Sequence, residues 1–300
     1  MTQVFALAFD HRNSLRRDFM HLAGDPTPEQ HAAMVTAKGV VVDALLAAAP
    51  EVSPGSPVLL IDHEYGGDLV AKAQAGGIRV AMPVEVSGQR ELRYLFEGHP
   101  ERIIADYGPD YVKVLIRYNP GGDAAMNARQ RARLRELAKL LDGRPQQLML
   151  ELLVPPEEAQ LAAVANDRGR FDREVRAELT ETAIGQIPGD GLRPPLWKIE
   201  GPESRDDAAR IAGAVRSADP DGACLVLGRG ADDAAVLRWL DIAAATDGFT
   251  GFAVGRTIWW DALRGYLDGG DRDAAVAAVT RRYLDLVREY RAAGEVPGAT

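Results

Sequence analysis

The chain is poor in cysteine, and this limits the chemistry that it can carry. Cys224 is the only cysteine among 300 residues. One cysteine excludes an intrachain disulfide and a cysteine-based zinc cluster, because both need more than one thiol. The lack of a disulfide framework is typical of proteins in a reducing compartment. We therefore expect a cytoplasmic protein.

Long apolar segments are also missing. No stretch approaches the roughly 18 uncharged apolar residues that indicate a transmembrane helix. The first residues, MTQVFALAFDHR, show neither a basic lead nor a small-residue cleavage site. The sequence therefore predicts neither a membrane span nor a secretion signal, and we expect no membrane partner.

An excess of positive charge is absent as well. The chain has 35 Lys and Arg against 44 Asp and Glu, which gives a formal net charge of -9. Nucleic-acid binders need a basic surface to neutralise phosphates, so no nucleic-acid partner is expected. The 46% apolar content is ordinary for a folded globular chain, and it is incompatible with disorder as the main state. A small metabolite is the expected partner.

What the sequence does contain is a repeated alternation of strand-like and helix-like segments. Eight short runs rich in β-branched residues are each followed by a turn and an amphipathic stretch. The runs cover residues 4–10, 58–63, 78–85, 111–118, 147–154, 196–201, 223–230 and 251–259. Helical periodicity is clearest over 27–49, 123–141, 205–218, 231–245 and 271–292. This order predicts parallel strands with right-handed crossovers.

Eight such units are enough to close a barrel. We predict an α/β protein, a (β/α)8 or TIM barrel, as one domain over residues 1–300. The alternative is an open doubly wound sheet, which normally carries a Gly-rich phosphate loop after its first strand. The turn over residues 9–13, FDHRN, has no such loop, so the barrel is favoured. The gap over 155–195 is interpreted as a lengthened connection on the active-site side.

Several charged residues fall inside or at the end of these apolar runs. Lys113, Glu151 and Lys198 each lie between apolar neighbours, while Asp10 and Asp62 end their runs. A barrel strand is buried on both faces, and burying an unpaired charge costs several kcal/mol. Such charges are retained where they pair or where function needs them. An inert salt-bridge network in the pore is the alternative reading.

The two lysines suggest amine chemistry. Side chains alternate along a strand, so Lys198 and Glu200 share a face that can point into the pore. A lysine near a second cation in a low-dielectric pocket has its pKa lowered, and its free amine can attack a ketone to form a Schiff base. Lys198 and Lys113 fit these roles. Glu151 is the candidate that moves protons during the reaction.

The last two strand ends carry Gly-Arg pairs. These are Gly228-Arg229-Gly230 and Gly255-Arg256. The loops after strands seven and eight of a barrel commonly bind phosphate through backbone N–H groups, and an arginine adds a bidentate clamp. The alternative is that the glycines serve only tight turns. Two such pairs at the two expected places favour a phosphorylated substrate.

Taken in order, six motifs at the strand ends resemble a known enzyme family. The chain looks like the class I aldolases of the tagatose-1,6-bisphosphate and sulfofructose-phosphate type. It is more similar still to the 2-deoxy-5-keto-D-gluconate-6-phosphate aldolase domain of myo-inositol catabolism. The resemblance covers nearly the whole chain. The motifs are FDHRNSLR at 9–16, LIDHEYG at 60–66, VKVL at 112–115, MLE at 149–151, WKIE at 197–200 and GRTIW at 255–259.

The resemblance implies roles for individual residues. It implies that Lys198 forms the Schiff base, that Lys113 is the second lysine and that Glu151 is the acid/base. It further implies that the strand-one aspartate is Asp10 and the phosphate-binding arginine is Arg256. Two positions depart from the tagatose-bisphosphate pattern, where a glutamine is usual for His11 and a serine-containing turn is usual for residues 228–230. Both departures agree better with the keto-gluconate relatives.

Metal chemistry is the competing route to the same bond cleavage, because class II aldolases polarise the ketone with zinc held by histidines. Only His11 and His63 lie near strand ends, and the last of the five histidines is His99. We therefore expect no metal and no cofactor. His11 and His63 are expected to make hydrogen bonds or to contact substrate hydroxyls, and a proton shuttle or a purely structural role is the alternative.

The sequence thus predicts a lyase, a metal-independent class I aldolase that acts on a phosphorylated keto sugar acid. The expected products are dihydroxyacetone phosphate and malonate semialdehyde. Such a substrate has a carboxylate as well as a phosphate, and Arg12 and Arg229 are available for either anion. Asp62 and Glu200 complete the expected substrate-binding set. A phospho-sugar sensor without catalysis is the alternative from another class, and a homo-oligomer is left open.

Overall fold

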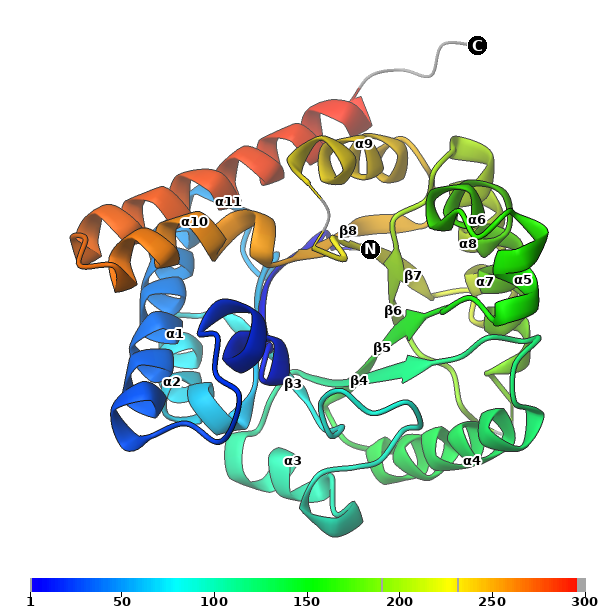
Figure 1. The fold of residues 1–300 in the computed structure, drawn as a ribbon, viewed down its shortest axis with the longest axis horizontal. Coiled ribbons are helices and arrows are strands. Elements are labelled where there is room, and N and C mark those ends of the chain that lie inside the picture. Colours follow the sequence, from blue (N-terminus) through cyan, green and yellow to red (C-terminus); the bar gives the residue numbers. More distant parts are fainter. Residues whose placement is uncertain (1, 190, 231, 296–300) are drawn as a thin grey trace.

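The computed structural model describes residues 2–189, 191–230 and 232–295. The remaining positions of the predicted domain, including residue 231 of the helix predicted over 231–245, lie outside the described residues. Eight parallel strands form a closed barrel in sequence order, and helices surround it (Figure 1). The predicted (β/α)8 fold is confirmed. The strands are β1 (Val4–Phe9), β2 (Pro57–Ile61), β3 (Arg79–Pro83), β4 (Tyr111–Arg117), β5 (Gln147–Leu153), β6 (Leu196–Glu200), β7 (Ala223–Leu227) and β8 (Phe249–Val254).

The helices form a shell around the strands. Side-chain caps start several of them: the Thr27 hydroxyl accepts from the backbone N–H of Gln30, and Asp123 and Asp232 act in the same way. The helices are α1 (Pro28–Ala48), α2 (His63–Ala75), α3 (Glu101–Tyr107), α4 (Ala124–Leu141), α5 (Glu158–Ala163), α6 (Arg168–Glu174), α7 (Arg176–Gln186), α8 (Arg205–Ala218), α9 (Asp233–Ala244), α10 (Arg256–Leu267) and α11 (Arg272–Glu295).

The end of the last strand differs most from the prediction. The eighth run was expected to extend over 251–259, but β8 ends at Val254 and α10 begins at Arg256. The apolar residues Ile258 and Trp259 continue the apolar pattern into the helix, where they are buried against the barrel. A short apolar run cannot distinguish a strand from a buried helical turn.

The barrel interior has two layers of different character. Small and apolar side chains such as Ala6, Leu60 and Leu225 fill the half that contains the strand N-termini, and they form a cluster of their own. Toward the strand C-termini the same inward face carries Lys113, Glu151 and Lys198, because side chains alternate along each strand. Inside the barrel, the charged layer therefore lies directly next to an apolar layer.

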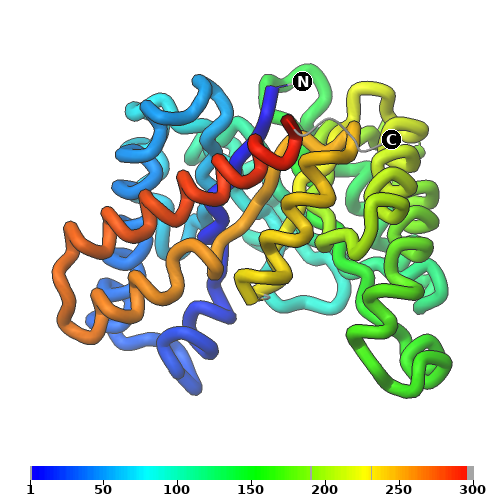
Figure 2. The backbone as a smooth tube through the Cα atoms, turned by 90° about the horizontal axis from the view of Figure 1, so that it is seen from above, coloured from blue at the N-terminus to red at the C-terminus, as the bar shows by residue number. Residues whose placement is uncertain are grey.

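The segment over 155–195 is a lengthened connection, as expected. It contains α5, α6 and α7 between β5 and β6. In Figure 2 this green segment and the blue segment after β1 project from the same end of the barrel. Phe171 and Asp172 of α6 line the pocket that opens at this end. The connection therefore builds one wall of the candidate site.

Helix α1 is unusually apolar. Among the described residues, the stretch Pro28–Glu51 is the one long and apolar enough to cross a membrane by length and composition, and 56% of its most apolar window is buried. The helix packs against α11, α2 and β1. Its Lys38 is fully buried in an ion pair with Asp62. Packing within the barrel shell therefore accounts for its apolar composition.

Candidate active site

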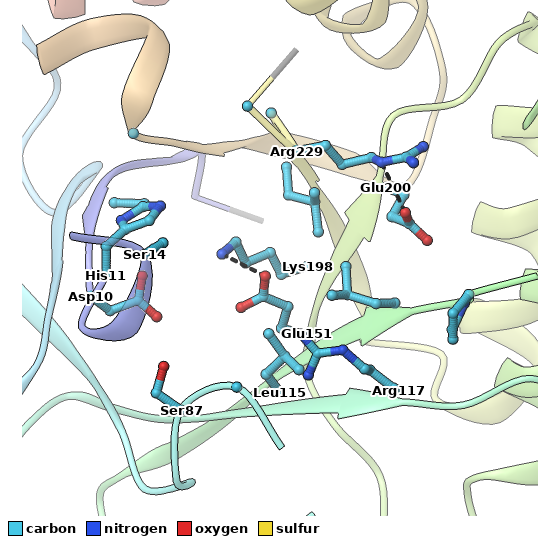
Figure 3. A pocket seen from close by; sticks show the side chains of 18 of the residues that line it. Asp10, His11, Ser14, Ser87, Leu115, Arg117, Glu151, Lys198, Glu200 and Arg229 are labelled. Atoms are coloured by element: carbon cyan, nitrogen blue, oxygen red, sulfur yellow. Dashed lines mark ion pairs between the residues drawn. The ribbon is translucent and has the colours of Figure 1, made fainter. Parts of the chain in front are cut away.

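A pocket of about 580 Å³ opens at the C-terminal ends of the strands. This volume is in the range of small-molecule sites, and the C-terminal mouth is where TIM-barrel enzymes place their active sites. Of the thirteen predicted site residues, all except Asp62 line this pocket. The close-up in Figure 3 shows Lys198 and Glu151 at its centre and Asp10 and His11 on one side.

Lys113 is the centre of a buried charge cluster. Its Nζ lies 2.9 Å from Asp10, 2.8 Å from Glu85 and 2.8 Å from Glu151. Burial by itself would lower the pKa of Lys113, but the three carboxylates outweigh burial and raise the pKa well above its ordinary value. Lys113 is therefore a permanently charged ammonium group, which suits a fixed cation and not a nucleophile.

Glu151 connects this cluster to the second lysine. One carboxylate oxygen lies 2.8 Å from Lys113 Nζ, and the other lies 3.0 Å from Lys198 Nζ. Burial would raise the pKa of Glu151, but the charges of the two lysines outweigh it and lower the pKa below its ordinary value. Glu151 is therefore ionised at neutral pH and is positioned to accept a proton from Lys198.

Glu85 belongs to this site, although it is not among the residues predicted from the sequence. It follows β3, is 5% exposed, and contacts Lys113 and Arg12. Burial raises the pKa of Glu85 despite these two cations. The available signal was its position at the end of an apolar run, which is also the position of Asp10 in the first run. Asp10, Glu85, Lys113, Glu151 and Lys198, from five strands or strand ends, thus share one charge network.

His11 lies beside the charge cluster around Lys113 and packs against aromatic side chains. Its ring meets Trp259 edge-on at 5.4 Å, and Trp259 stacks on Phe9 at 4.2 Å. Burial lowers the pKa of His11 to about 4, although the neighbouring Asp10 acts in the opposite direction. The imidazole is therefore neutral at pH 7, which suits hydrogen bonding to a substrate.

Glu200 and Arg229 form part of a second network at the rim. Arg229 lies 3.1 Å from Glu200 and 2.9 Å from Asp172 of α6, and Glu200 accepts from the Val154 backbone N–H at 2.9 Å. Burial raises the pKa of Glu200 to about 7, although Arg176 lowers it. These contacts hold α6, which forms one side of the pocket, against the ends of β6 and β7.

The ends of β7 and β8 are fitted closely to each other. A Cβ at Gly230, whose φ is +70°, would lie 2.0 Å from the Arg256 guanidinium, and that group donates to the Arg229 carbonyl at 2.9 Å. A Cβ at Gly255 would lie 2.0 Å from the Ala8 carbonyl oxygen. The two glycines therefore allow Arg256 to cross the turn and α10 to begin directly against β1. Gly228 also lines the pocket here.

Two of the predicted anion-binding residues are not free cations. Arg12 is 4% exposed, donates to the Glu85 carbonyl at 2.8 Å and lies 3.9 Å from the Glu85 carboxylate. Arg229 is paired with Asp172 and Glu200. Both line the pocket, but their charges are already balanced by carboxylates. Their role as ligands of substrate anions stays a prediction, and a substrate anion would compete with these carboxylates.

The prediction for Asp62 is wrong. Its side chain caps α2 by accepting from the Tyr65 N–H at 2.9 Å, and it lies 2.5 Å from Lys38 Nζ. Both residues are fully buried outside the pocket. Lys38 also donates to the carbonyls of Phe9 and His11, so the pair fixes the turn after β1. Asp62 is structural because it lies beneath that turn and not in the mouth.

The geometry defines a lysine-centred pocket at the mouth of a (β/α)8 barrel, with a bridging carboxylate and arginines at the rim. In the described part of the chain, no three His, Cys, Asp or Glu residues are grouped to hold a metal ion. The chain belongs to the family described as "Uncharacterized protein conserved in bacteria (DUF2090)", which matches residues 1–294. No curated protein matches the sequence.

Solved structures share the fold at low sequence identity. A fructose-bisphosphate aldolase from Plasmodium falciparum is 13% identical with a TM-score of 0.67, over 100% of this chain and 93% of that chain. An archaeal fructose 1,6-bisphosphate aldolase is 15% identical with a TM-score of 0.58, over 97% and 94%. A Schiff-base-forming fructose-1,6-bisphosphate aldolase is 14% identical with a TM-score of 0.56, over 95% and 94%. These likenesses show the barrel fold.

Proposed function

We propose that the protein is a metal-independent class I aldolase that uses Lys198 as its Schiff-base nucleophile. The observation that carries the proposal is the Lys198–Glu151 contact of 3.0 Å in a buried pocket, with Lys113 held as a separate cation on the other carboxylate oxygen. A nucleophile touching its proton acceptor is the arrangement that covalent catalysis requires. The likeness to Schiff-base-forming aldolases supports the same chemistry by analogy of fold.

The proposed reaction begins with proton transfer from Lys198 to Glu151, which frees the amine. The amine attacks the substrate ketone, and Glu151 returns the proton so that the carbinolamine loses water and an iminium forms. The C–C bond between the carbon next to the iminium carbon and the following, hydroxyl-bearing carbon then breaks. Its electron pair moves into the iminium, the hydroxyl proton goes to a carboxylate, and an aldehyde leaves. Protonation and hydrolysis of the remaining enamine release the ketone product and restore Lys198.

The substrate that we propose is 2-deoxy-5-keto-D-gluconate 6-phosphate, which gives dihydroxyacetone phosphate and malonate semialdehyde. Arg256, at the start of α10, supports a phosphate at the end of β8, since the first backbone N–H groups of a helix have no partner within the helix. The six strand-end motifs support a keto sugar acid of inositol catabolism in a cytoplasmic setting. Tagatose 1,6-bisphosphate and the sulfofructose phosphate are the alternative substrates.

The test is borohydride trapping with dihydroxyacetone phosphate in the presence of EDTA. We expect the intact mass to increase by one reduced triose phosphate, because an iminium is reduced to a stable amine and no metal is needed. The control omits borohydride and should give no adduct. Absence of an adduct at saturating triose phosphate, or formation of one only after zinc is added, would overturn the proposal and favour a sensor or a metal enzyme.

A further inference from the structure

The pocket contains more arginine than its own acids neutralise. Seven arginines line it, and three of them pair with carboxylates, Arg12 with Glu85, Arg17 with Asp18, and Arg229 with Asp172 and Glu200. Among the described residues the other four make no ion pair. Two of these, Arg90 and Arg168, are exposed, whereas Arg117 and Arg256 are half-buried. The seven are Arg12, Arg17, Arg90, Arg117, Arg168, Arg229 and Arg256.

The two half-buried arginines lie on opposite sides of the barrel. Arg117 ends β4, and Arg256 follows β8, which is four strands away in an eight-stranded ring. Figure 3 shows Arg117 across the pocket from Arg229, the neighbour of Arg256, with Lys198 and Glu151 between them. A guanidinium that is partly removed from water gains most when an anion replaces the lost hydration. The arrangement therefore fits a substrate with an anion at each end.

The chemistry of the Arg117 end differs from that of the Arg256 end. The N–H groups of Gly121 and Gly122 in the loop after β4 are already donated to Asn119, both at 2.9 Å. One Arg117 nitrogen donates to the Gln89 carbonyl at 2.8 Å, and no acceptor within the described chain takes its other N–H groups. The remaining N–H groups of Arg117 form a planar fork that matches the two coplanar oxygens of a carboxylate.

The residues between Arg117 and the charged layer are apolar. Along β4 and β5 the inward face carries Lys113 and Glu151 first and then Leu115 and Leu153, with Arg117 paired in register to Leu153. Both leucines line the pocket. A substrate carbon that lacks a hydroxyl group can pack against these two leucines, because no polar group is then buried without a hydrogen-bond partner.

We propose that Arg117 binds the carboxylate of the aldehyde half of the substrate, with Leu115 and Leu153 against the methylene next to it. This inference rests on the proposed aldolase function and makes Arg117 a specificity residue. The substrate class is a keto acid with a phosphate beside the ketone and a carboxylate at the far end.

The experiment measures condensation of dihydroxyacetone phosphate with three aldehydes, in wild type and in Arg117→Leu. The aldehydes are freshly generated malonate semialdehyde, glyceraldehyde 3-phosphate and uncharged glyceraldehyde. Loss of one charged hydrogen-bonding partner should raise the KM for malonate semialdehyde about 10- to 100-fold. The KM for glyceraldehyde should be unchanged, and Arg117→Lys should recover part of the loss, because it keeps the charge but not the fork geometry.

Arg93→Leu is the matched control, because Arg93 is an exposed arginine in the loop after β3 and does not line the pocket. It should leave all three KM values unchanged. Equal KM changes for charged and uncharged aldehydes in Arg117→Leu, or a loss confined to glyceraldehyde 3-phosphate, would overturn the carboxylate assignment. Borohydride trapping of dihydroxyacetone phosphate on Arg117→Leu separates the two proposals. A normal adduct with no aldehyde selectivity contradicts this inference alone, whereas no adduct in wild type contradicts the aldolase.

Discussion

Lys198 Nζ lies 3.0 Å from one oxygen of Glu151, whose other oxygen lies 2.8 Å from Lys113. The two lysines therefore share one carboxylate but have different surroundings. Lys113 has two further carboxylates at hydrogen-bond distance, whereas Glu151 is the one acid in contact with Lys198 among the described residues. This asymmetry identifies Lys113 as the fixed charge and is compatible with the proposed role of Lys198 as the nucleophile.

The first prediction concerns the trapped lysine. With dihydroxyacetone phosphate and borohydride, the adduct should map to the peptide that contains Lys198, and Lys198→Ala should form no adduct. The reason is that Lys113 is held as an ammonium group by three carboxylates. Peptide mapping by mass spectrometry makes the measurement. An adduct on Lys113 with Lys198 unmodified would reverse the assignment.

The second prediction concerns stability. Lys113→Met should lower the free energy of unfolding by about 3–5 kcal/mol, because Asp10, Glu85 and Glu151 would lose their shared buried counterion. Urea unfolding at pH 7 measures the change, and part of it should be recovered at lower pH, where carboxylates protonate. Lys139→Met, in the last turn of α4 and outside the pocket, serves as the control. Equal stability of the two variants would show that the cluster is not held together by Lys113.

The third prediction concerns proton transfer by Glu151. Glu151→Gln preserves size and hydrogen bonding but cannot accept the Lys198 proton, so kcat should fall by about 10²-fold or more. Steady-state kinetics give the value, with Glu158→Gln on the exposed face of α5 as the control. Wild-type turnover in Glu151→Gln would reduce Glu151 to an ion-pair partner.

The fourth prediction concerns phosphate recognition. Arg256→Ala should reduce kcat/KM for 2-deoxy-5-keto-gluconate 6-phosphate, because one partner of a charged contact is lost. The reduction should correspond to a loss of about 2–4 kcal/mol in transition-state stabilisation. The unphosphorylated sugar acid should be affected far less, since the anchor lies away from the bond that breaks. An unchanged preference for the phosphate in Arg256→Ala would move the phosphate site elsewhere on the rim.

The fifth prediction concerns pH. The pKa of His11 is lowered from 6.5 to about 4 in the folded protein, so the unfolded chain binds more protons between these values and stability falls as the pH falls. The loss should reach up to about 3 kcal/mol between pH 6.5 and pH 4. His11→Gln should lack this part of the pH dependence, and exposed His31→Gln should retain it. Unfolding curves at pH 7 and pH 4.5 test this, and identical pH dependence in wild type and His11→Gln would contradict it.

The sequence anticipated much of the candidate site because charges are costly inside barrel strands. Lys113, Glu151 and Lys198 are conspicuous between apolar neighbours, and alternation places them on one face. Glu85 and Arg117 were missed because charged residues at the ends of strands are also common in exposed turns. Only the closed ring shows that Glu85 reaches Lys113 and that Arg117 lies opposite Arg256.

The sequence by itself determined the order of strands and helices, the barrel and the layer of charge within it, because these follow from local periodicity and from the cost of burial. The tertiary structure decided which charges are balanced. Asp62 pairs with Lys38 beneath the first turn, Arg229 pairs with Asp172 of a distant helix, and no acid among the described residues contacts Arg117. Pairing depends on distances between residues that are remote in sequence, and closure of the ring sets those distances.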